Sequence, residues 1–135
     1  MIVIDTSALA KYILKEEGWR GVYEVIRTNS PIYSIDLMLK EIANVIWKYV
    51  KRRLINDEIA LELFDAVIDL VDSGVILLEP ERDYLRNALE IALHSSVTVY
   101  DSLYIAQAMR RGSLLTSDKE QADAARRLGI SVIQM

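Results

Sequence analysis

Short apolar runs alternate with longer amphipathic segments along this chain, and this alternation restricts the possible folds more than any other feature of the sequence. A short apolar run is typical of a buried strand, whereas apolar residues three and four positions apart indicate a helix. We expect strands at 1–4, 31–35, 75–78, 113–116 and 130–133. We expect helices at 8–17, 19–28, 37–53, 57–72, 80–94, 100–111 and 119–128. Strands separated by helices favour a parallel sheet covered on both faces, so we predict a three-layer α/β/α sandwich with a central, mainly parallel sheet.

Length and composition are those of a globular protein. With 135 residues, 52% of them hydrophobic and 27% charged, we expect a single domain spanning 1–135. Cysteine is absent, which excludes disulfides and thiolate metal sites, and His94 is the only histidine, which excludes a multi-histidine zinc site. The first apolar run stops at Asp5, too early for a signal peptide, and no run approaches the roughly 18 residues of a membrane span. We therefore expect a cytoplasmic protein with no membrane contact.

Acidic and hydroxyl side chains follow two of the expected strands directly. Asp5, Thr6 and Ser7 end the first apolar run, and the fourth run ends through Thr116 at Asp118. In an open α/β sheet, ligands bind at the carboxyl ends of the strands. Asp5 and Asp118 are therefore candidate functional residues.

Two further acids stand in positions that surface acids seldom occupy. Glu41 lies near the start of a helix that follows a strand, and Asn44 and Lys48 share its helical face. Asp101 lies at the amino end of an expected helix among apolar and aromatic residues. An acid in that place is also compatible with a helix cap or a partner of the helix dipole.

The sequence excludes several common chemistries. It contains neither the Gly-x-Gly-x-x-Gly nor the Gly-Lys-Ser/Thr type of phosphate loop, which argues against nucleotide cofactors and NTP hydrolysis. A Ser-His catalytic pair would depend on His94, and there is no Gly-x-Ser-x-Gly elbow. The chemistry that remains is that of carboxylates.

The segments around these acids, taken in order, resemble the PIN-domain family, in particular its small single-domain toxins of the VapC type. The resemblance rests on 4–7, on 41–44, on Asp101 with Tyr104 and Ala106, and on 112–118. It implies an active-site quartet of Asp5, Glu41, Asp101 and Asp118, supported by the hydroxyls of Thr6 and Thr116, by Asn44 and, more weakly, by Ser7. It also implies a metal-dependent endoribonuclease that a small antitoxin protein keeps silent.

Physical chemistry agrees with that implication. Four carboxylates brought together repel one another unless a cation lies between them, and oxygen ligands without sulfur or imidazole favour Mg²⁺ or Mn²⁺. A net charge of -4 is unusual for a nucleic-acid binder. If four of the carboxylates bind a metal ion, however, the remaining acidic and basic side chains are equal in number. We predict hydrolysis of an RNA phosphodiester by water, with Asp5, Asp101 and Asp118 as metal ligands. Glu41 is either a further ligand or the group that orients the attacking water.

Two alternative functions use the same acids differently. A phosphoryl-transfer domain of the haloacid-dehalogenase type needs a second aspartate two places after the first, where this chain has Ser7. A phosphate-receiver domain needs an early pair of acidic residues, whereas Asp5 has no acidic neighbour. A catalytically silent binding module with a PIN fold is the alternative from another class.

Aromatic residues suggest a surface for a protein partner. The helices expected at 37–53 and 57–72 carry more large apolar side chains than one packed face needs, namely Trp47, Tyr49, Leu61 and Phe64. These residues indicate either a surface for a homodimer, a larger homo-oligomer or an antitoxin, or ordinary packing of one helix on the other.

Overall fold

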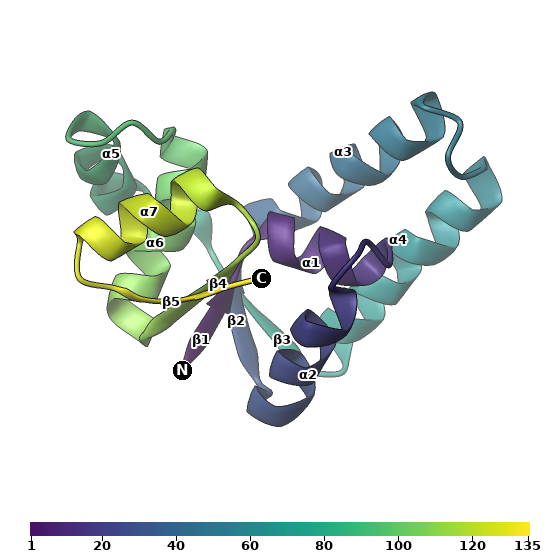
Figure 1. Cartoon of the computed structure of the whole chain (residues 1–135), viewed down its shortest axis with the longest axis horizontal. Helices are drawn as coiled ribbons and strands as arrows, with labels where there is room; N and C mark the ends of the chain where they lie inside the picture. Colours follow the sequence, from purple (N-terminus) through teal and green to yellow (C-terminus); the bar gives the residue numbers. More distant parts are fainter.

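The computed structural model describes all residues 1–135 and has one sheet with the strand order β3-β2-β1-β4-β5 (Figure 1). All four strand pairings are parallel, so the sheet is entirely parallel rather than mainly parallel. The strands are β1 (Ile2–Ile4), β2 (Ile32–Ile35), β3 (Ile76–Glu79), β4 (Ser113–Thr116) and β5 (Ser131–Gln134). The predicted α/β fold is confirmed, with five strands close to their expected positions.

Helices cover both faces of the sheet. In Figure 1, α5, α6 and α7 lie to the left of the strands, and α1 to α4 lie to the right. The helices are α1 (Thr6–Ile13), α2 (Trp19–Asn29), α3 (Leu37–Lys51), α4 (Asp57–Asp72), α5 (Leu85–Leu93), α6 (Val99–Arg111) and α7 (Lys119–Arg127). None of these helices combines the length and the apolar character needed to cross a bilayer.

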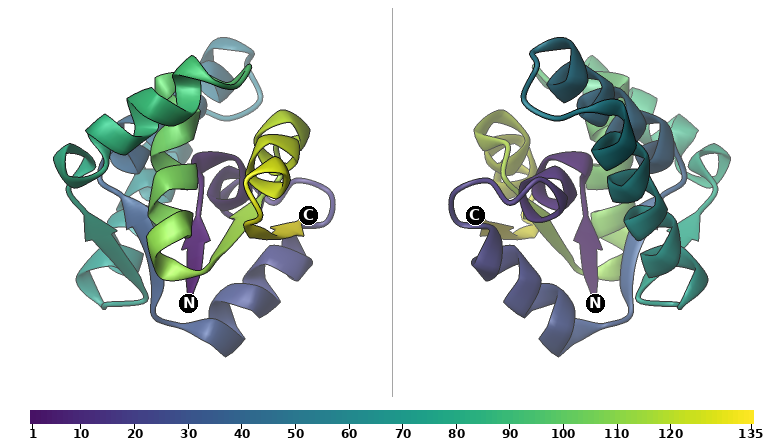
Figure 2. Two further views of the ribbon diagram at one scale, coloured as in Figure 1. Left: turned by 90° about the vertical axis from the view of Figure 1, so that its left-hand side faces the viewer. Right: turned by 90° about the vertical axis from the view of Figure 1, so that its right-hand side faces the viewer.

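The core lies on both faces of the central strands. Figure 2 shows β1 in the middle of the sheet, between β2 and β4. Val3, Ile4, Leu114 and Leu115 are completely buried, which matches strands covered by helices on both sides. The apolar residues of β1 therefore fix the position of the carboxyl end at Asp5.

The helix expected at 8–17 is shorter at its carboxyl end. It ends at Ile13 because Lys15 adopts a left-handed backbone with φ 54°, and the amides of Lys15 and Glu16 donate to the carbonyls of Tyr12 and Lys11. This Schellman arrangement usually uses glycine, so a lysine in this position could not be recognised in advance as the end of a helix. Gly18, with φ 87°, precedes α2 and does not end α1.

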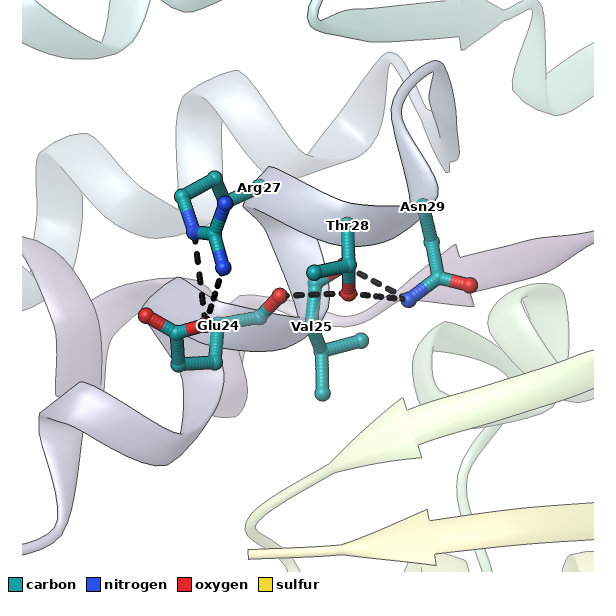
Figure 3. Close-up of polar contacts among 5 residues, drawn as sticks. All are labelled: Glu24, Val25, Arg27, Thr28 and Asn29. Carbon is teal, nitrogen blue, oxygen red and sulfur yellow. Dashed lines mark hydrogen bonds and ion pairs between the residues drawn. The ribbon is translucent and has the colours of Figure 1, made fainter.

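Side chains in the last turns of α2 bond back to the helix itself (Figure 3). Thr28 Oγ1 donates to the carbonyl of Glu24, and Asn29 Nδ2 donates to the carbonyl of Val25, at 2.7 and 2.9 Å. Arg27 forms an ion pair with the Glu24 carboxylate at 2.7 Å. Helix α2 extends to Asn29, one residue beyond the prediction, and Ser30 Oγ donates at 2.6 Å to the carbonyl of Ile26, one of the four that the helix end leaves free.

The helix expected at 80–94 is divided. A short 3₁₀ helix, η1 (Glu81–Asp83), precedes α5, and Tyr84 lies between the two with φ -117°. Tyr84 is only 1% exposed, and its hydroxyl donates to Glu79 Oε1 at 2.8 Å. The inward turn of this side chain accounts for the interruption of the helix.

Candidate active site

The candidate site lies at the carboxyl edge of the sheet. Asp5 follows β1 directly and caps α1, while Thr116 ends β4 and Asp118 caps α7. Because β1 and β4 are parallel neighbours, their carboxyl ends meet at one edge. The topology thus brings together two acids that are more than a hundred residues apart in the sequence.

Asp5 is buried and held by hydrogen bonds. It is 1% exposed, and its Oδ1 accepts from the Ala8 amide at 2.9 Å and from Ser7 Oγ at 2.7 Å. Its Oδ2 accepts from Thr116 Oγ1. Burial raises the pKa of Asp5 to about 6, and the neighbouring charge of Asp118 acts in the same direction, while these hydrogen bonds oppose the rise. One carboxylate therefore serves both as a helix cap and as a wall of the site.

Glu41, on α3, meets side chains from two other helices. Its Oε1 accepts from Thr6 Oγ1 at 2.8 Å and from the Tyr104 hydroxyl at 2.5 Å, and these two hydroxyls lie 3.0 Å apart. Burial, followed by the charge of Glu41, keeps the pKa of Tyr104 well above its usual range. The Tyr104 hydroxyl therefore remains protonated.

Asp101 and Asp118 are linked through Gln121. The Asp118 carboxylate accepts a hydrogen bond from the backbone amide of Gln121 at 3.1 Å. The side-chain Nε2 of Gln121 donates to the backbone carbonyl of Asp101 at 3.0 Å. The cap of α6 is Thr98, whose Oγ1 accepts from the Asp101 amide at 3.2 Å, so the alternative in which Asp101 caps this helix is wrong. Asp101 lies in the first turn, and its carboxylate accepts no hydrogen bond within the protein.

Uncompensated negative charge surrounds Asp101. Burial raises its pKa to about 6, and the charges of Asp118, Glu41 and Glu120 add to the shift. Asp101 is thus the only one of the four acids whose carboxylate accepts no hydrogen bond from the protein, and the neighbouring charges that shift its pKa are all negative, which suits a ligand for a cation.

The four acids line one pocket with a volume of about 290 Å³. Its walls are Asp5, Thr6, Ser7, Glu41, Asn44, Val45, Lys48, Asp101, Tyr104, Asp118 and Gln121. Of the predicted site residues, only Thr116 is outside the walls; it is completely buried behind Asp5, and its Oγ1 lies 3.2 Å from Ser7 Oγ. The structure thus brings the predicted residues into one place.

Sequence reasoning gave no site role to four residues of the pocket, namely Val45, Lys48, Tyr104 and Gln121. Tyr104 stands three positions after Asp101, and Gln121 stands three positions after Asp118. Residues three apart on a helix share a face, so this spacing was the available signal.

The residues fit a hard divalent cation in their chemistry. The pocket offers four carboxylates against a single ammonium group, that of Lys48, and oxygen donors of this kind suit Mg²⁺ and Mn²⁺. No three carboxylate or imidazole groups are arranged so that they could hold a metal ion as they stand. Binding would therefore require side-chain movement, for which the unbonded Asp101 carboxylate is the best placed.

Comparison with known proteins identifies the family. The sequence profile of the PIN domain matches residues 2–127, so this chain belongs to the PIN domain family. The resemblance inferred from the motifs is thereby confirmed.

Individual relatives agree with this assignment. The chain is 28% identical over 123 residues to Ribonuclease VapC3 from Pyrobaculum aerophilum, covering 90% of this chain and 92% of the relative. The crystal structure of PAE2754 from the same organism has a TM-score of 0.72 at 20% identity, covering 97% of this chain and 81% of that one. VapC20 of Mycobacterium tuberculosis, described as a toxin that cleaves the sarcin-ricin loop, has a TM-score of 0.71 at 15% identity and full coverage of both chains. These two structural matches show a shared fold.

Proposed function

We propose that this protein is a metal-dependent endoribonuclease that hydrolyses RNA phosphodiester bonds and serves as the toxin of a toxin-antitoxin pair. The observation that carries the proposal is the pocket at the carboxyl edge of the sheet, where the four predicted acids meet. Family membership supports it, as do the names of a ribonuclease and a toxin among the similar proteins.

In this proposal Asp5, Asp101 and Asp118 hold Mg²⁺ or Mn²⁺. The bound ion supplies Lewis-acid chemistry, because it neutralises phosphate charge and lowers the pKa of water. Asp5 is fixed by its buried hydrogen bonds, whereas the Asp101 carboxylate is free to adjust. Glu41 faces the same pocket and either joins the ligands or orients the attacking water. The oxygen of that water would bond to phosphorus as the bond from phosphorus to the leaving ribose oxygen breaks; the water would lose a proton to solvent and the leaving oxygen would take one up, so that the products are a phosphomonoester and a hydroxyl.

Lys48 supplies the positive charge of the pocket. Its side chain is exposed, forms no ion pair and lines the rim two helical turns beyond Glu41. We assign it to a phosphate of the RNA strand next to the reacting one, because nucleic-acid backbones are bound chiefly through cations.

The alternatives have less support. A receiver domain has the strand order 2-1-3-4-5, which differs from the order β3-β2-β1-β4-β5 of this sheet. Where a haloacid-dehalogenase-type enzyme needs its second aspartate, Ser7 donates a hydrogen bond to Asp5. A silent binding module would keep the pocket without its activity, and the assay below separates it from a nuclease.

A groove between α3 and α4 supports a protein partner. It has a volume of about 490 Å³ and is lined by Ala43, Ile46, Trp47, Val50, Lys51, Asp57, Ala60, Leu61 and Phe64. Trp47 and Leu61 are 54% and 68% exposed. Tyr49, also expected on this surface, instead donates to Glu16 at 2.6 Å, outside the groove.

The charge beside this groove suggests the chemistry of the partner. Helix α4 carries six acids and no base: Asp57, Glu58, Glu62, Asp65, Asp69 and Asp72. We propose that the antitoxin docks here through a segment that is apolar on one side and basic on the other. Self-association into a homodimer or larger homo-oligomer remains a prediction; the exposed leucines of α5 at Leu85, Leu89 and Leu93 offer a second apolar stripe for it.

The test of the ribonuclease proposal is Asp5→Asn. Asparagine also caps helices, so α1 is retained while the charge is lost. We expect cleavage of RNA in Mg²⁺ or Mn²⁺, followed on gels, to fall by orders of magnitude with unchanged circular dichroism. Asp69→Asn, on the exposed face of α4, should cleave like the wild type. Wild-type rates in Asp5→Asn would remove Asp5 from the site, and an inactive wild-type protein would favour the silent binding module.

A further inference from the structure

The Tyr104 hydroxyl lies among the acids of the pocket without being one of the predicted site residues. Tyr104 is 1% exposed and comes from α6, one turn after Asp101. Its hydroxyl donates to Glu41 Oε1 at 2.5 Å, Thr6 Oγ1 donates to the same oxygen at 2.8 Å, and the two hydroxyl oxygens lie 3.0 Å apart. Three helices, α1, α3 and α6, thus meet at one carboxylate oxygen.

These two hydrogen bonds make the two oxygens of Glu41 unequal. Oε1 accepts from two hydroxyls, which fills the usual capacity of a carboxylate oxygen, whereas Oε2 has no hydrogen-bond partner in the protein. A freely rotating carboxylate would offer both oxygens to a cation. Held as it is, Glu41 has one oxygen left to present to the pocket.

We propose that Tyr104 is a positioning residue that, together with Thr6, holds Glu41 so that Oε2 alone serves the reacting centre. The proposal rests on the proposed ribonuclease function and adds to it. Both candidate roles of Glu41, ligand and orienter of water, need one oxygen in a fixed place, because small displacements of a positioned group are costly to rate. Loss of the Tyr104 hydroxyl should therefore affect turnover rather than RNA binding.

The chain contains a matched control for the structural contribution of such a bond. Tyr84 is also 1% exposed, and its hydroxyl donates to Glu79 Oε1 at 2.8 Å, outside the pocket. Tyr84→Phe and Tyr104→Phe each remove one buried hydroxyl from one glutamate and keep the aromatic ring. A merely structural role for Tyr104 predicts that the two variants behave alike.

The experiment compares these two variants in cleavage and in metal binding. For Tyr104→Phe we expect kcat to fall about tenfold or more with the KM for RNA unchanged, as for the loss of a hydrogen bond to a charged group. Mn²⁺ affinity, measured by titration calorimetry without RNA, should weaken severalfold. Tyr84→Phe should keep kcat and Mn²⁺ affinity even if its melting temperature falls as far. The proposal is overturned if Tyr104→Phe retains both quantities, or if Tyr84→Phe loses them equally.

A spectroscopic readout separates this inference from the ribonuclease proposal. In proton NMR, the wild type should show a slowly exchanging low-field hydroxyl signal that disappears in Tyr104→Phe and persists in Tyr84→Phe. If the wild type cleaves no RNA, the ribonuclease proposal fails. The role of Tyr104 is then decided by two measurements that need no cleavage, the hydroxyl signal in the NMR spectrum and the affinity for Mn²⁺. In that case, where no kcat can be measured, absence of the signal from the wild type or wild-type Mn²⁺ affinity in Tyr104→Phe would overturn the inference.

Discussion

Asp5 caps α1 and lines the pocket, and in the proposed function the same side chain also holds the metal ion. The sequence suggested both the cap and the place in a site, because an acid followed by two hydroxyls ends an apolar run. The structure adds the partners of each oxygen, and it shows that burial holds the pKa values of Asp5 and Asp101 at about 6. The acids of the pocket could be predicted from the sequence, but not the carboxylate to which each hydroxyl donates. Thr6 donates to Glu41 and not to the adjacent Asp5, whereas Thr116 donates to Asp5.

The raised pKa values predict a cation effect that depends on pH. Both acids titrate in the folded protein above their ordinary value of 3.8, so the metal-free folded state binds more protons than the unfolded state between about pH 4 and 6. Stability from these groups therefore falls as pH rises through that window. Millimolar Mg²⁺ or Mn²⁺ should raise the melting temperature more at about pH 7.5, where the carboxylates repel, than at about pH 5, where protons occupy them.

Differential scanning fluorimetry measures this effect directly. Asp101→Asn should show a smaller metal-induced rise than the wild type, because it removes the one carboxylate of the four that accepts no hydrogen bond from the protein. No rise in the wild type, or an equal rise at both pH values, would contradict a carboxylate site for the cation.

At the scale of the elements, β3 is fixed at its end by a polar cluster. The Glu79 carboxylate pairs with Arg111 Nη2 at 2.5 Å and accepts from Gln107 Nε2 at 3.0 Å, in addition to Tyr84. Arg111 and Gln107 both lie on α6, so this cluster ties the edge of the sheet to the helix that carries Asp101. These contacts join residues that are far apart in the sequence and therefore leave no periodic pattern in it. For that reason neither the cluster nor the helix break at Tyr84 was predicted.

This cluster predicts a loss of stability in acid. The hydrogen bond from Arg111 is the main cause that lowers the pKa of Glu79 to about 2 from its ordinary 4.5. The unfolded state therefore takes up the proton first, so the stabilisation is complete above about pH 4.5 and is lost as pH falls towards 2. In urea unfolding, Glu79→Gln should reduce stability at neutral pH and flatten the decline over this window.

Glu90→Gln is the control for that measurement. Glu90 pairs with Arg86 at 3.6 Å on the exposed face of α5, where ion pairs contribute little. Its unfolding free energy should follow the wild type at every pH. If the decline of the unfolding free energy in acid became equally shallow in both variants, it would arise from surface charge in general and not from the Glu79 cluster.

At the scale of the whole molecule, the alternation of strands and helices was sufficient to predict a parallel α/β sandwich. It fixed the carboxyl edge as the place of the site, because that edge follows from topology and not from local detail. It could not fix element ends: α1 stops early through the backbone of Lys15, which no glycine marks. Nor could it separate Trp47, which is exposed at the groove, from Tyr49, which is bonded to Glu16.

The groove between α3 and α4 gives a prediction about the partner. If the neighbouring reading frame encodes a small protein that forms a complex with this chain on co-expression, Trp47→Asp should weaken that complex at least about thirtyfold, as expected for an exposed aromatic anchor. Binding is measured by calorimetry after co-purification of the wild-type complex. Tyr100→Ser, at an exposed aromatic of α6 outside the groove, should bind normally. Equal affinity of Trp47→Asp and the wild type would place the partner elsewhere.

The central place of β1 also determines when the site comes into being during synthesis. The first strand of the chain pairs with β2 on one side and with β4, at Ser113–Thr116, on the other. Asp5 precedes Thr116 and Asp118 by more than a hundred residues, so its surroundings are completed only after all of that intervening chain has been made. Such distant pairing is slow to form. A partly synthesised chain that still lacks β4 therefore cannot form the finished pocket.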